Sequence, residues 1–249
     1  MPGFILPASG MRLEIAALSN LPEVRPGDDL ATLIRPAAGI DRSVIVAVAQ
    51  KIVSKSEGAI VDLREIEPSA LARSWAVEWN KDARLIELIL AQSRRIVKMD
   101  RGVIIAETQH GFVCANAGVD QSNVPGDDFA TVLPIDPDAS ARRLHASLGC
   151  GAVIVTDTFG RPWREGLVDV AIGLAGLEPL DDHRGRADLH GRKLASTIIA
   201  VADQLAAVAG LVMRKDAGCP VALIRGFDWQ PAEGTARALL RKPEQDLFR

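Results

Sequence analysis

Two aspartates stand where apolar segments of the sequence give way to polar residues. Asp120 lies in the stretch Ala-Asn-Ala-Gly-Val-Asp-Gln-Ser-Asn at 115–123, and Asp157 follows Val-Ile-Val-Thr at 153–156. Carboxylates flanked by hydroxyl and amide groups offer the hard oxygen ligands that Mg²⁺ and Mn²⁺ prefer. Such ions also bind phosphates, so each aspartate is a candidate metal ligand. The alternative is an Asx-turn or a helix cap, because aspartate is common where strands end.

Lys55 is the third candidate for chemistry. It lies in Lys-Ile-Val-Ser-Lys-Ser-Glu-Gly at 51–58, a polar stretch that directly follows an apolar, β-branched segment. A lysine held at a loop beside a sheet can act as a point charge for a phosphate group. The alternative is an ordinary solvated lysine on the protein surface.

The other polar and aromatic candidates fit structural roles better. His183 and His190 lie among aspartates at a spacing that matches no familiar metal site, which favours a polar loop. His110 precedes a glycine and is expected in a turn. Trp75 and Trp79 are four residues apart on an expected helix, so we expect them to pack in the core.

The motifs of several common enzyme classes are missing. The sequence contains no GxxxxGK[ST] and no GxGxxG, which argues against a P-loop enzyme or a Rossmann dehydrogenase. It also lacks HExxH and GxSxG, which removes the commonest metalloprotease and hydrolase interpretations. There is no Tyr among the 249 residues, so no phenol can serve as an acid or a ligand.

Helices and strands do not alternate regularly along the chain. Short apolar segments predict strands at 12–18, 43–49, 94–105, 111–115, 151–155, 168–175 and 221–225. Capping residues and apolar periodicity predict helices at 68–79, 82–92, 136–148 and 191–211. A loop is expected at 120–128 and a polar tail at 230–249. This order favours an α+β fold with mixed or largely antiparallel sheets and flanking helices, in one domain over 1–249 that could comprise two subdomains.

Charge and hydropathy limit the possible partners. The net charge of −3 gives no broad basic field, so we expect no nucleic-acid partner. No apolar run approaches the roughly 20 residues of a membrane span, and the first residues show no secretory pattern. Three separated cysteines form no C-x-x-C pair and favour a reducing cytoplasm, with only Cys150 in an exposed-looking setting.

Several longer stretches closely resemble the coenzyme F-420-0:gamma-glutamyl ligase family. The resemblance rests on KIVSKSEG at 51–58, NAGVDQSNV at 116–124, TDTFGRPWREG at 156–166 and GRADLHGRKL at 185–194, and it runs in order from about 12 to 226. The tail at 230–249 resembles that of bacterial members. The resemblance implies an unusual α+β fold and an intertwined homodimer of the stand-alone form.

The resemblance also implies a reaction. Family members use GTP to join L-glutamate to the phospholactyl carboxylate of F-420-0 and then add further glutamates through gamma linkages. Since a carboxylate is a poor electrophile, the gamma-phosphate of GTP would first convert it to an acyl phosphate, which the glutamate amine attacks. The products besides the amide are GDP and phosphate. Two Mg²⁺ or Mn²⁺ ions are implied, and K⁺ is a further candidate cation.

Site residues are carried over position by position from the same resemblance. The implied metal ligands are Asp120, Asp157, Thr158 and the backbone of Arg214. The implied GTP contacts are Leu21, Pro22, Glu23, Val24, Gln50, Lys51, Lys55, Asn123, Val212, Met213, Arg214, Lys215, Asp216, Ala217 and Gly218. Lys55 would also stabilise charge on the phosphate during catalysis.

Two departures from the family pattern keep other functions open. Arg214 and Lys215 stand in a loop that is glycine-rich in archaeal members, and Gln50-Lys51 replaces small hydroxyl residues of some relatives. The alternatives are a ligase of the same mechanism with another amino acid or carboxylate, and a catalytically silent nucleotide-binding homologue. Four arginines are candidates to bind anionic substrate groups, since guanidinium groups suit carboxylate and phosphate: Arg161, Arg164, Arg186 and Arg192.

Overall fold

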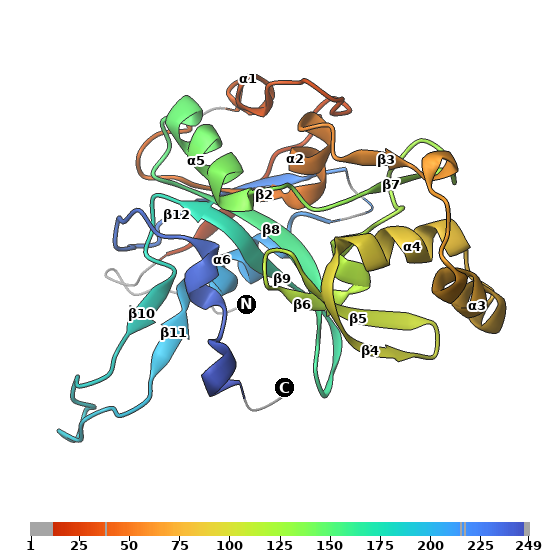
Figure 1. The fold of residues 1–249 in the computed structure, drawn as a ribbon. Helices are drawn as coiled ribbons and strands as arrows, with labels where there is room; N and C mark the ends of the chain where they lie inside the picture. The colour runs from red at the N-terminus through yellow and green to blue at the C-terminus, as the bar shows by residue number, and fades with distance from the viewer. Residues whose placement is uncertain (1–11, 38, 215, 217, 247–249) are drawn as a thin grey trace, which may run out of the picture.

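A five-stranded sheet forms the centre of the molecule (Figure 1). The computed structural model describes residues 12–37, 39–214, 216 and 218–246. The strands of the central sheet, in spatial order, are β1 (Glu14–Ala17), β12 (Val221–Arg225), β2 (Ile45–Ala49), β8 (Ala152–Arg161) and β9 (Arg164–Ala175). Only β2 and β8 are parallel, and the other neighbours are antiparallel. The predicted α+β class with a largely antiparallel sheet is confirmed.

Both faces of this sheet are covered by helices, as the strand sequences require. The β2 residues alternate between two apolar cores, because successive side chains of a strand point to opposite faces. One core contains Val46 and Val48 and the helices α1 (Leu30–Ile34), α2 (Gln50–Ser56) and α5 (Pro137–Leu148). The other contains Ile45 and Ala47 and the helix α6 (Val201–Gly210). A strand buried on both faces explains the unbroken apolar run in β2.

A second, smaller lobe lies beside the central sheet (Figure 1). It consists of the helices α3 (Ala70–Trp79) and α4 (Ala83–Gln92) and the sheet of β4 (Ser93–Asp100), β5 (Val103–Thr108) and β6 (Val113–Ala115). A two-stranded ribbon of β3 (Ile60–Asp62) and β7 (Phe129–Thr131) joins it to the rest. Short 3₁₀ turns lie at Leu63–Glu65, Asn116–Gly118, Ala236–Leu239 and Pro243–Gln245. The lobe has its own apolar core, to which Trp75 contributes as predicted.

Local capping signals placed three helices correctly. The Asp136 carboxylate accepts the N–H of Ala139 at the start of α5, and Gly149 ends that helix with a positive φ of 68°. Asp82 caps α4, and Ser69 caps α3 two residues later than the predicted start. Because a side-chain cap depends only on neighbouring residues, it can be recognised in the sequence.

Several predicted elements were wrong in extent, including the strand expected at 168–175, which begins at Arg164. The expected helix at 191–211 is only α6, preceded by an arm in which β10 (Leu180–Asp182) pairs with β11 (Ile198–Ala200). Asp188 caps a turn of this arm, since its carboxylate accepts the N–H groups of His190 and Arg192. The expected strand at 94–105 is the β4–β5 hairpin, and β8 continues six residues beyond Val155.

Part of the segment 230–246 packs against the main body, although a polar tail was predicted there. Ala236 is fully buried, and its N–H donates to the Asp138 carboxylate at 2.9 Å. The same carboxylate oxygen accepts the N–H of Leu174 in β9.

Among the residues that the structure describes, none of the helices is long and apolar enough to cross a membrane. The single-domain division over 1–249 and the intertwined dimer stay predictions.

Candidate active site

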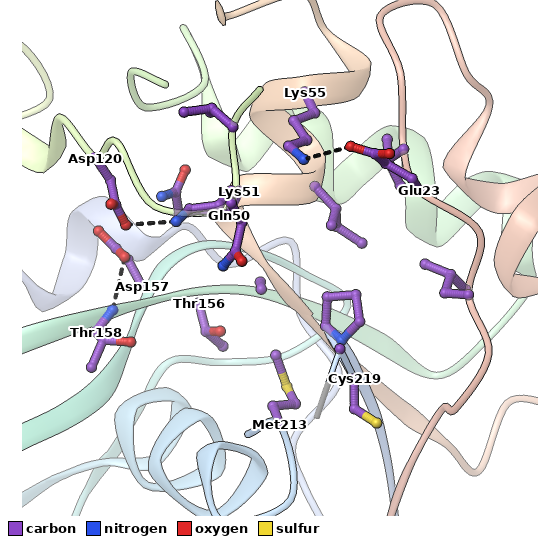
Figure 2. Close-up of a pocket in the computed structure, with 18 of the residues that line it drawn as sticks. Glu23, Gln50, Lys51, Lys55, Asp120, Thr156, Asp157, Thr158, Met213 and Cys219 are labelled. Carbon is purple, nitrogen blue, oxygen red and sulfur yellow. Dashed lines mark hydrogen bonds and ion pairs between the residues drawn. The ribbon is translucent and has the colours of Figure 1, made fainter. Parts of the chain in front are cut away.

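A cavity of about 760 Å³ opens beside the parallel strands β2 and β8 (Figure 2). Its wall includes residues of α2, which directly follows β2, and residues 156–158 of β8. Most of the predicted site residues line it, although they come from distant parts of the sequence. They are Leu21, Pro22, Glu23, Val24, Gln50, Lys51, Lys55, Asp120, Asn123, Asp157, Thr158, Met213, Arg214 and Gly218. The fold therefore brings these residues to one place.

Two more predicted residues of the loop after α6, Val212 and Asp216, do not line the cavity. Val212 packs against the apolar core under α6. Asp216 is exposed and its carboxylate accepts two hydrogen bonds from the Arg214 guanidinium, at 2.7 and 3.1 Å. Lys215 and Ala217 lie outside the described residues.

Lys51 and Lys55 lie on a helix, which corrects the predicted polar loop. The residues 50–56 form α2, and its helical period of about 3.6 places positions 51 and 55 on one face. Lys55 is only 8% exposed, so the interpretation as a solvated surface lysine is wrong. Its ammonium lies 3.7 Å from a carboxylate oxygen of Glu23, and both side chains line the cavity (Figure 2). Burying a lysine is costly unless a charge compensates it.

The Asp120 side of the cavity already holds a positive charge. Lys51 Nζ lies 2.7 Å from Asp120 Oδ2, and it also donates to the backbone oxygen of Ser122 at 2.8 Å and to the Ser122 hydroxyl. Partial burial raises the pKa of Asp120, but the Lys51 ammonium and the N–H of Ser122 outweigh this effect and hold the pKa below its ordinary value. Asp120 is therefore ionised at neutral pH.

The second predicted carboxylate lies within β8 rather than after its end. Asp157 Oδ1 accepts the N–H of Thr158 at 2.8 Å. The Thr158 hydroxyl donates to Asp169 Oδ1 at 2.7 Å, across the β8–β9 pair. Because the hydroxyl proton is directed to Asp169, the oxygen lone pairs of Thr158 remain as possible ligand positions. Asp169 also lines the cavity and abuts Gly210, where an added Cβ would lie 2.6 Å from the carboxylate.

These oxygen atoms fit a hard divalent cation that also binds phosphate. Among residues 12–37, 39–214, 216 and 218–246, no three Asp, Glu, His or Cys side chains form a group that could hold a metal ion. The available donors are the Asp120 and Asp157 carboxylates and the Thr158 hydroxyl, all oxygen. Mg²⁺ commonly uses one or two protein carboxylates and completes its shell with water and phosphate. The Lys51 ammonium among the oxygens of Asp120 and Ser122 shows that this side of the cavity accommodates a cation.

The sequence interpretation missed several residues of the cavity wall. They are Ala49, Ile52, Val124, Pro125, Thr156, Asp169, Cys219 and Pro220. Asp169 could not have been found from the Pro162-Trp163 turn, because counting outward from it pairs Thr158 with Leu167. The register shift between Gly160 and Arg161 brings Asp169 opposite Thr158 instead. The others are mostly apolar and lie within two residues of a predicted one in the sequence.

The four candidate arginines lie outside the cavity lining. Arg161 donates to the backbone oxygen of Glu165 near the tip of the β8–β9 hairpin, close to the exposed Arg164. Arg186 pairs with Asp181 in the arm, which also carries Arg192. Their role in binding anionic substrate groups stays a prediction. In the same arm His183 pairs with Asp181, as expected for a polar loop.

The three cysteines differ in their surroundings. The expectation that Cys150 is exposed is wrong, since it is 3% exposed, and burial raises its pKa to about 11. Burial first and the nearby Asp157 second raise the pKa of Cys114 to about 12. Cys219 is half-buried and lines the cavity. The thiolate is the reactive form, so Cys219 is the cysteine best placed to react with a thiol reagent.

We therefore expect a thiol reagent such as dithionitrobenzoate to label Cys219 first in the native protein. If GTP occupies the cavity, a concentration of about ten times its Kd slows this labelling by about tenfold, because the free form is depleted in proportion. The absorbance of the released thionitrobenzoate anion is the readout. Cys219→Ala is the control and should lose the fast phase. Fast labelling that saturating GTP leaves unchanged would place the nucleotide elsewhere.

The fold and the cavity together define a class: an α+β protein whose lysine- and aspartate-lined site suits phosphorylated ligands. A model of the F420-0:Gamma-glutamyl ligase family matches residues 19–226. The chain belongs to this family, and the resemblance seen in the sequence is confirmed.

Relatives of the same family cover nearly the whole chain. A protein named coenzyme F420:L-glutamate ligase from Methanothermobacter thermautotrophicus is 46% identical over 253 residues, which cover 96% of this chain and 100% of the relative. The protein of that name from Methanopyrus kandleri is 47% identical over 249 residues, covering 96% and 98%. That from Methanocaldococcus jannaschii is 39% identical over 246 residues, covering 96% and 97%.

Proposed function

We propose that this chain is a GTP-dependent ligase that joins L-glutamate to the phospholactyl carboxylate of F-420-0. It then adds further glutamates through gamma linkages. Family membership and the printed names of the relatives support the substrates. The observation that carries the chemistry is the grouping of Lys51 and Lys55 with the carboxylates of Asp120 and Asp157 around one cavity. This combination suits a phosphate chain and its counter-cations.

The reaction begins with activation of the acceptor carboxylate. Its oxygen attacks the gamma-phosphorus of GTP, the bond to the beta–gamma bridging oxygen breaks, and an acyl phosphate and GDP form. The glutamate amine then attacks the acyl carbon, loses a proton and displaces inorganic phosphate. Charge develops on phosphate oxygens in both steps, so fixed positive groups such as Lys55 lower the barrier most directly.

The chain's own residues position the reactants. The loop Leu21–Val24 and the helix α2 both line the cavity and would contact the nucleotide, with Asn123 as a further polar contact. Asp120, Asp157 and Thr158 would hold two Mg²⁺ or Mn²⁺ ions, with the backbone of Arg214 as an additional ligand. Such ions neutralise the phosphate charge as it develops. A cation bound to Asp120 would displace the Lys51 ammonium from this carboxylate, and Lys51 would then interact with the phosphates.

Other properties of the family are proposed here as well. We expect a cytoplasmic homodimer of intertwined chains, and K⁺ as a candidate additional cation. The alternative of a ligase with another amino acid or carboxylate is favoured by Gln50 and Arg214, which line the cavity and replace smaller residues of some relatives. A silent homologue is less consistent with the site, because Asp120, Asp157 and Lys55 are retained and line the cavity.

Nucleotide turnover tests this proposal. With GTP, Mn²⁺, F-420-0 and L-glutamate, we expect GDP and phosphate to form in equal amounts, and little of either when F-420-0 is omitted. If the acceptor carboxylate carries oxygen-18, one labelled oxygen should appear in the released phosphate, because the acyl phosphate breaks at its acyl carbon–oxygen bond. Turnover without label in the phosphate would contradict the acyl-phosphate step, and no GTP turnover would contradict the proposed function.

A further inference from the structure

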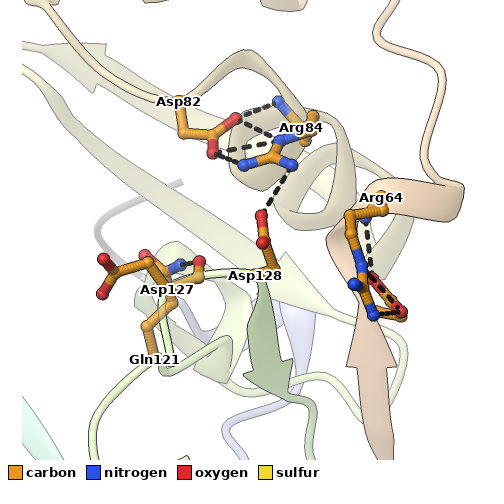
Figure 3. Close-up of polar contacts among 7 residues, drawn as sticks. Arg64, Asp82, Arg84, Gln121, Asp127 and Asp128 are labelled. Atoms are coloured by element: carbon orange, nitrogen blue, oxygen red, sulfur yellow. Dashed lines mark hydrogen bonds and ion pairs between the residues drawn. The ribbon is translucent and has the colours of Figure 1, made fainter. Parts of the chain in front are cut away.

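The loop that carries Asp120 and Asn123 is held at both ends. Asp120 and Thr131 form an isolated antiparallel bridge, with N–H to oxygen distances of 3.0 and 2.8 Å, so the loop leaves and returns at the same point. Within it, the Gln121 side-chain amide donates to the backbone oxygen of Asp127 at 3.1 Å (Figure 3). Between Gln121 and Asp127, the residues Asn123, Val124 and Pro125 line the cavity.

The far end of this loop is tied to the smaller lobe through Asp128. The backbone oxygen of Asp128 accepts the N–H of Leu63 at 2.8 Å. Its carboxylate Oδ1 accepts a hydrogen bond from Arg84 Nη1 at 2.9 Å (Figure 3). Arg84 is the second residue of α4 and lies 44 positions before Asp128 in the sequence. The hydrogen bond from Arg84 to Asp128 therefore links the position of the loop to the start of α4.

Arg84 is itself fixed before it reaches the loop. The carboxylate of Asp82, the cap of α4, accepts the backbone N–H of Arg84 at 2.8 Å, its Nε at 3.1 Å and its Nη2 at 2.7 Å. This leaves Nη1 directed at Asp128. A planar guanidinium can bridge two carboxylates in this way, whereas a lysine presents its donors from a single point. The interaction with Arg84 also holds the pKa of Asp82 below its ordinary value.

A second arginine provides a built-in comparison. Arg64 follows Asp62 at the same spacing, and Asp62 accepts its backbone N–H at 2.9 Å, its Nε at 2.9 Å and its Nη2 at 2.6 Å. The Arg64 guanidinium lies 5.5 Å from the centre of the Phe129 ring instead of donating to the loop's carboxylate. The two arginines thus share their local structure and differ in the bond to Asp128 (Figure 3).

The exposure of the Arg84–Asp128 pair indicates what it contributes. The side chains are 32% and 45% exposed, and ion pairs in contact with solvent add little to global stability. Such a pair can still restrict the Asp128 end of the loop, in addition to the Asp120–Thr131 bridge and the Gln121–Asp127 hydrogen bond. A small displacement of the loop moves both Asp120 and Asn123 relative to a nucleotide in the cavity, and misplacement of binding groups reduces affinity and rate steeply.

We propose that Arg84 is a positioning residue for the nucleotide site, which acts through Asp128 on the loop that carries Asp120 and Asn123. This inference rests on the proposed function, because it takes the nucleotide to bind in the cavity. Arg84 lies outside the cavity lining and touches no proposed ligand. Its effect is on the geometry of the loop, and the fold does not depend on it.

The test compares Arg84→Gln with Arg64→Gln in the full chain. We expect Arg84→Gln to raise the GTP dissociation constant, measured by titration calorimetry with Mn²⁺ present, by about tenfold. Arg64→Gln should bind GTP as the wild type does. The two variants should have similar melting temperatures, because each loses one comparable side-chain interaction with its helix cap. In steady-state assays, the KM for GTP should rise for Arg84→Gln only.

Two further variants separate positioning from a structural role. Asp128→Ala removes a partly exposed acceptor and should reproduce the GTP defect without affecting folding. The double variant Arg84→Gln/Asp128→Ala should bind GTP no more weakly than either single variant, since the two substitutions remove the same contact. Arg84→Lys should not rescue GTP binding, because it keeps the charge but not the second donor.

The outcomes distinguish this inference from the proposed function. If the wild type binds no GTP, the proposed function fails. If the wild type binds GTP and Arg84→Gln binds it equally well, the positioning role is wrong. Equal GTP defects in Arg84→Gln and Arg64→Gln, or additive defects in the double variant, would also overturn it.

Discussion

Asp157→Ala is expected to abolish glutamyl transfer while leaving the protein folded. The side chain lines the cavity, and its backbone neighbours in β8 pair with β9 whether or not the carboxylate is present. In the proposed function Asp157 holds a cation that neutralises the charge developing on phosphate. Loss of such electrostatic stabilisation typically lowers kcat by about 10²–10³-fold, and weaker metal binding adds to the loss. We therefore expect product formation to fall by at least about 10³-fold.

The measurement is product formation at saturating GTP and Mn²⁺, together with circular dichroism and the melting temperature. Asp157→Asn is the matched variant, because it keeps the shape and an oxygen for the N–H of Thr158 but removes the charge. It should be nearly as inactive. Asp100→Ala, which removes a carboxylate paired with Lys98 on the surface of β4, should retain full activity. Turnover of Asp157→Ala at the wild-type rate would end its assignment as a metal ligand.

Asp120→Ala should show the same loss for the same reason. Here the protein also loses the partner of Lys51, but the lysine keeps its hydrogen bonds to Ser122. Titration of Mn²⁺ by electron paramagnetic resonance provides a readout that does not depend on turnover. Both Asp120→Ala and Asp157→Ala should bind Mn²⁺ more weakly than the wild type, in the presence of GTP. Unchanged Mn²⁺ affinity in both variants would place the metal elsewhere.

Lys55→Met is expected to weaken GTP binding strongly. Methionine has a similar length and suits the mostly buried position, so the change removes the charge with little loss of packing. A hydrogen bond to a charged group is worth about 1.5–3 kcal/mol. That corresponds to about a ten- to hundredfold rise in the dissociation constant of GTP. Titration calorimetry measures it directly.

The matched control is Lys98→Met on the surface of β4. The Lys98 side chain is 68% exposed and pairs with Asp100, far from the cavity lining. This variant should bind GTP as the wild type does, which separates the loss of a site charge from the loss of any lysine. A Lys55→Met protein with wild-type GTP affinity and kcat would show that the buried lysine serves only its pair with Glu23.

Local signals in the sequence predicted the elements that depend on neighbouring residues. The caps Asp82 and Asp136 and the apolar runs of β2 and β12 were sufficient to place α4, α5 and two central strands. The arm of β10 and β11 was missed because it depends on pairing between residues about 18 positions apart, which overrides the helical composition near 191–197. The length of β8 likewise depends on its partner β9.

The candidate site shows the same division. The identities of Asp120, Asp157 and Lys55 suggested chemistry, and the resemblance to a family connected them. The burial of Lys55 could not be seen in the sequence, since it results from packing against segments such as Glu23 from elsewhere in the chain. The contact of Lys51 with Asp120, the pairing of Thr158 with Asp169 and the tie from Arg84 to Asp128 are long-range contacts of the same kind.

The product of the wild-type enzyme tests the central claim most directly. Purified protein should be incubated with F-420-0, L-glutamate, GTP and Mn²⁺, and the deazaflavin analysed by liquid chromatography and mass spectrometry. The account predicts species heavier than F-420-0 by one or more glutamyl units, absent when GTP or glutamate is omitted and absent with Asp157→Ala. Unchanged F-420-0, in a reaction where a known ligase of this family forms product, would contradict it.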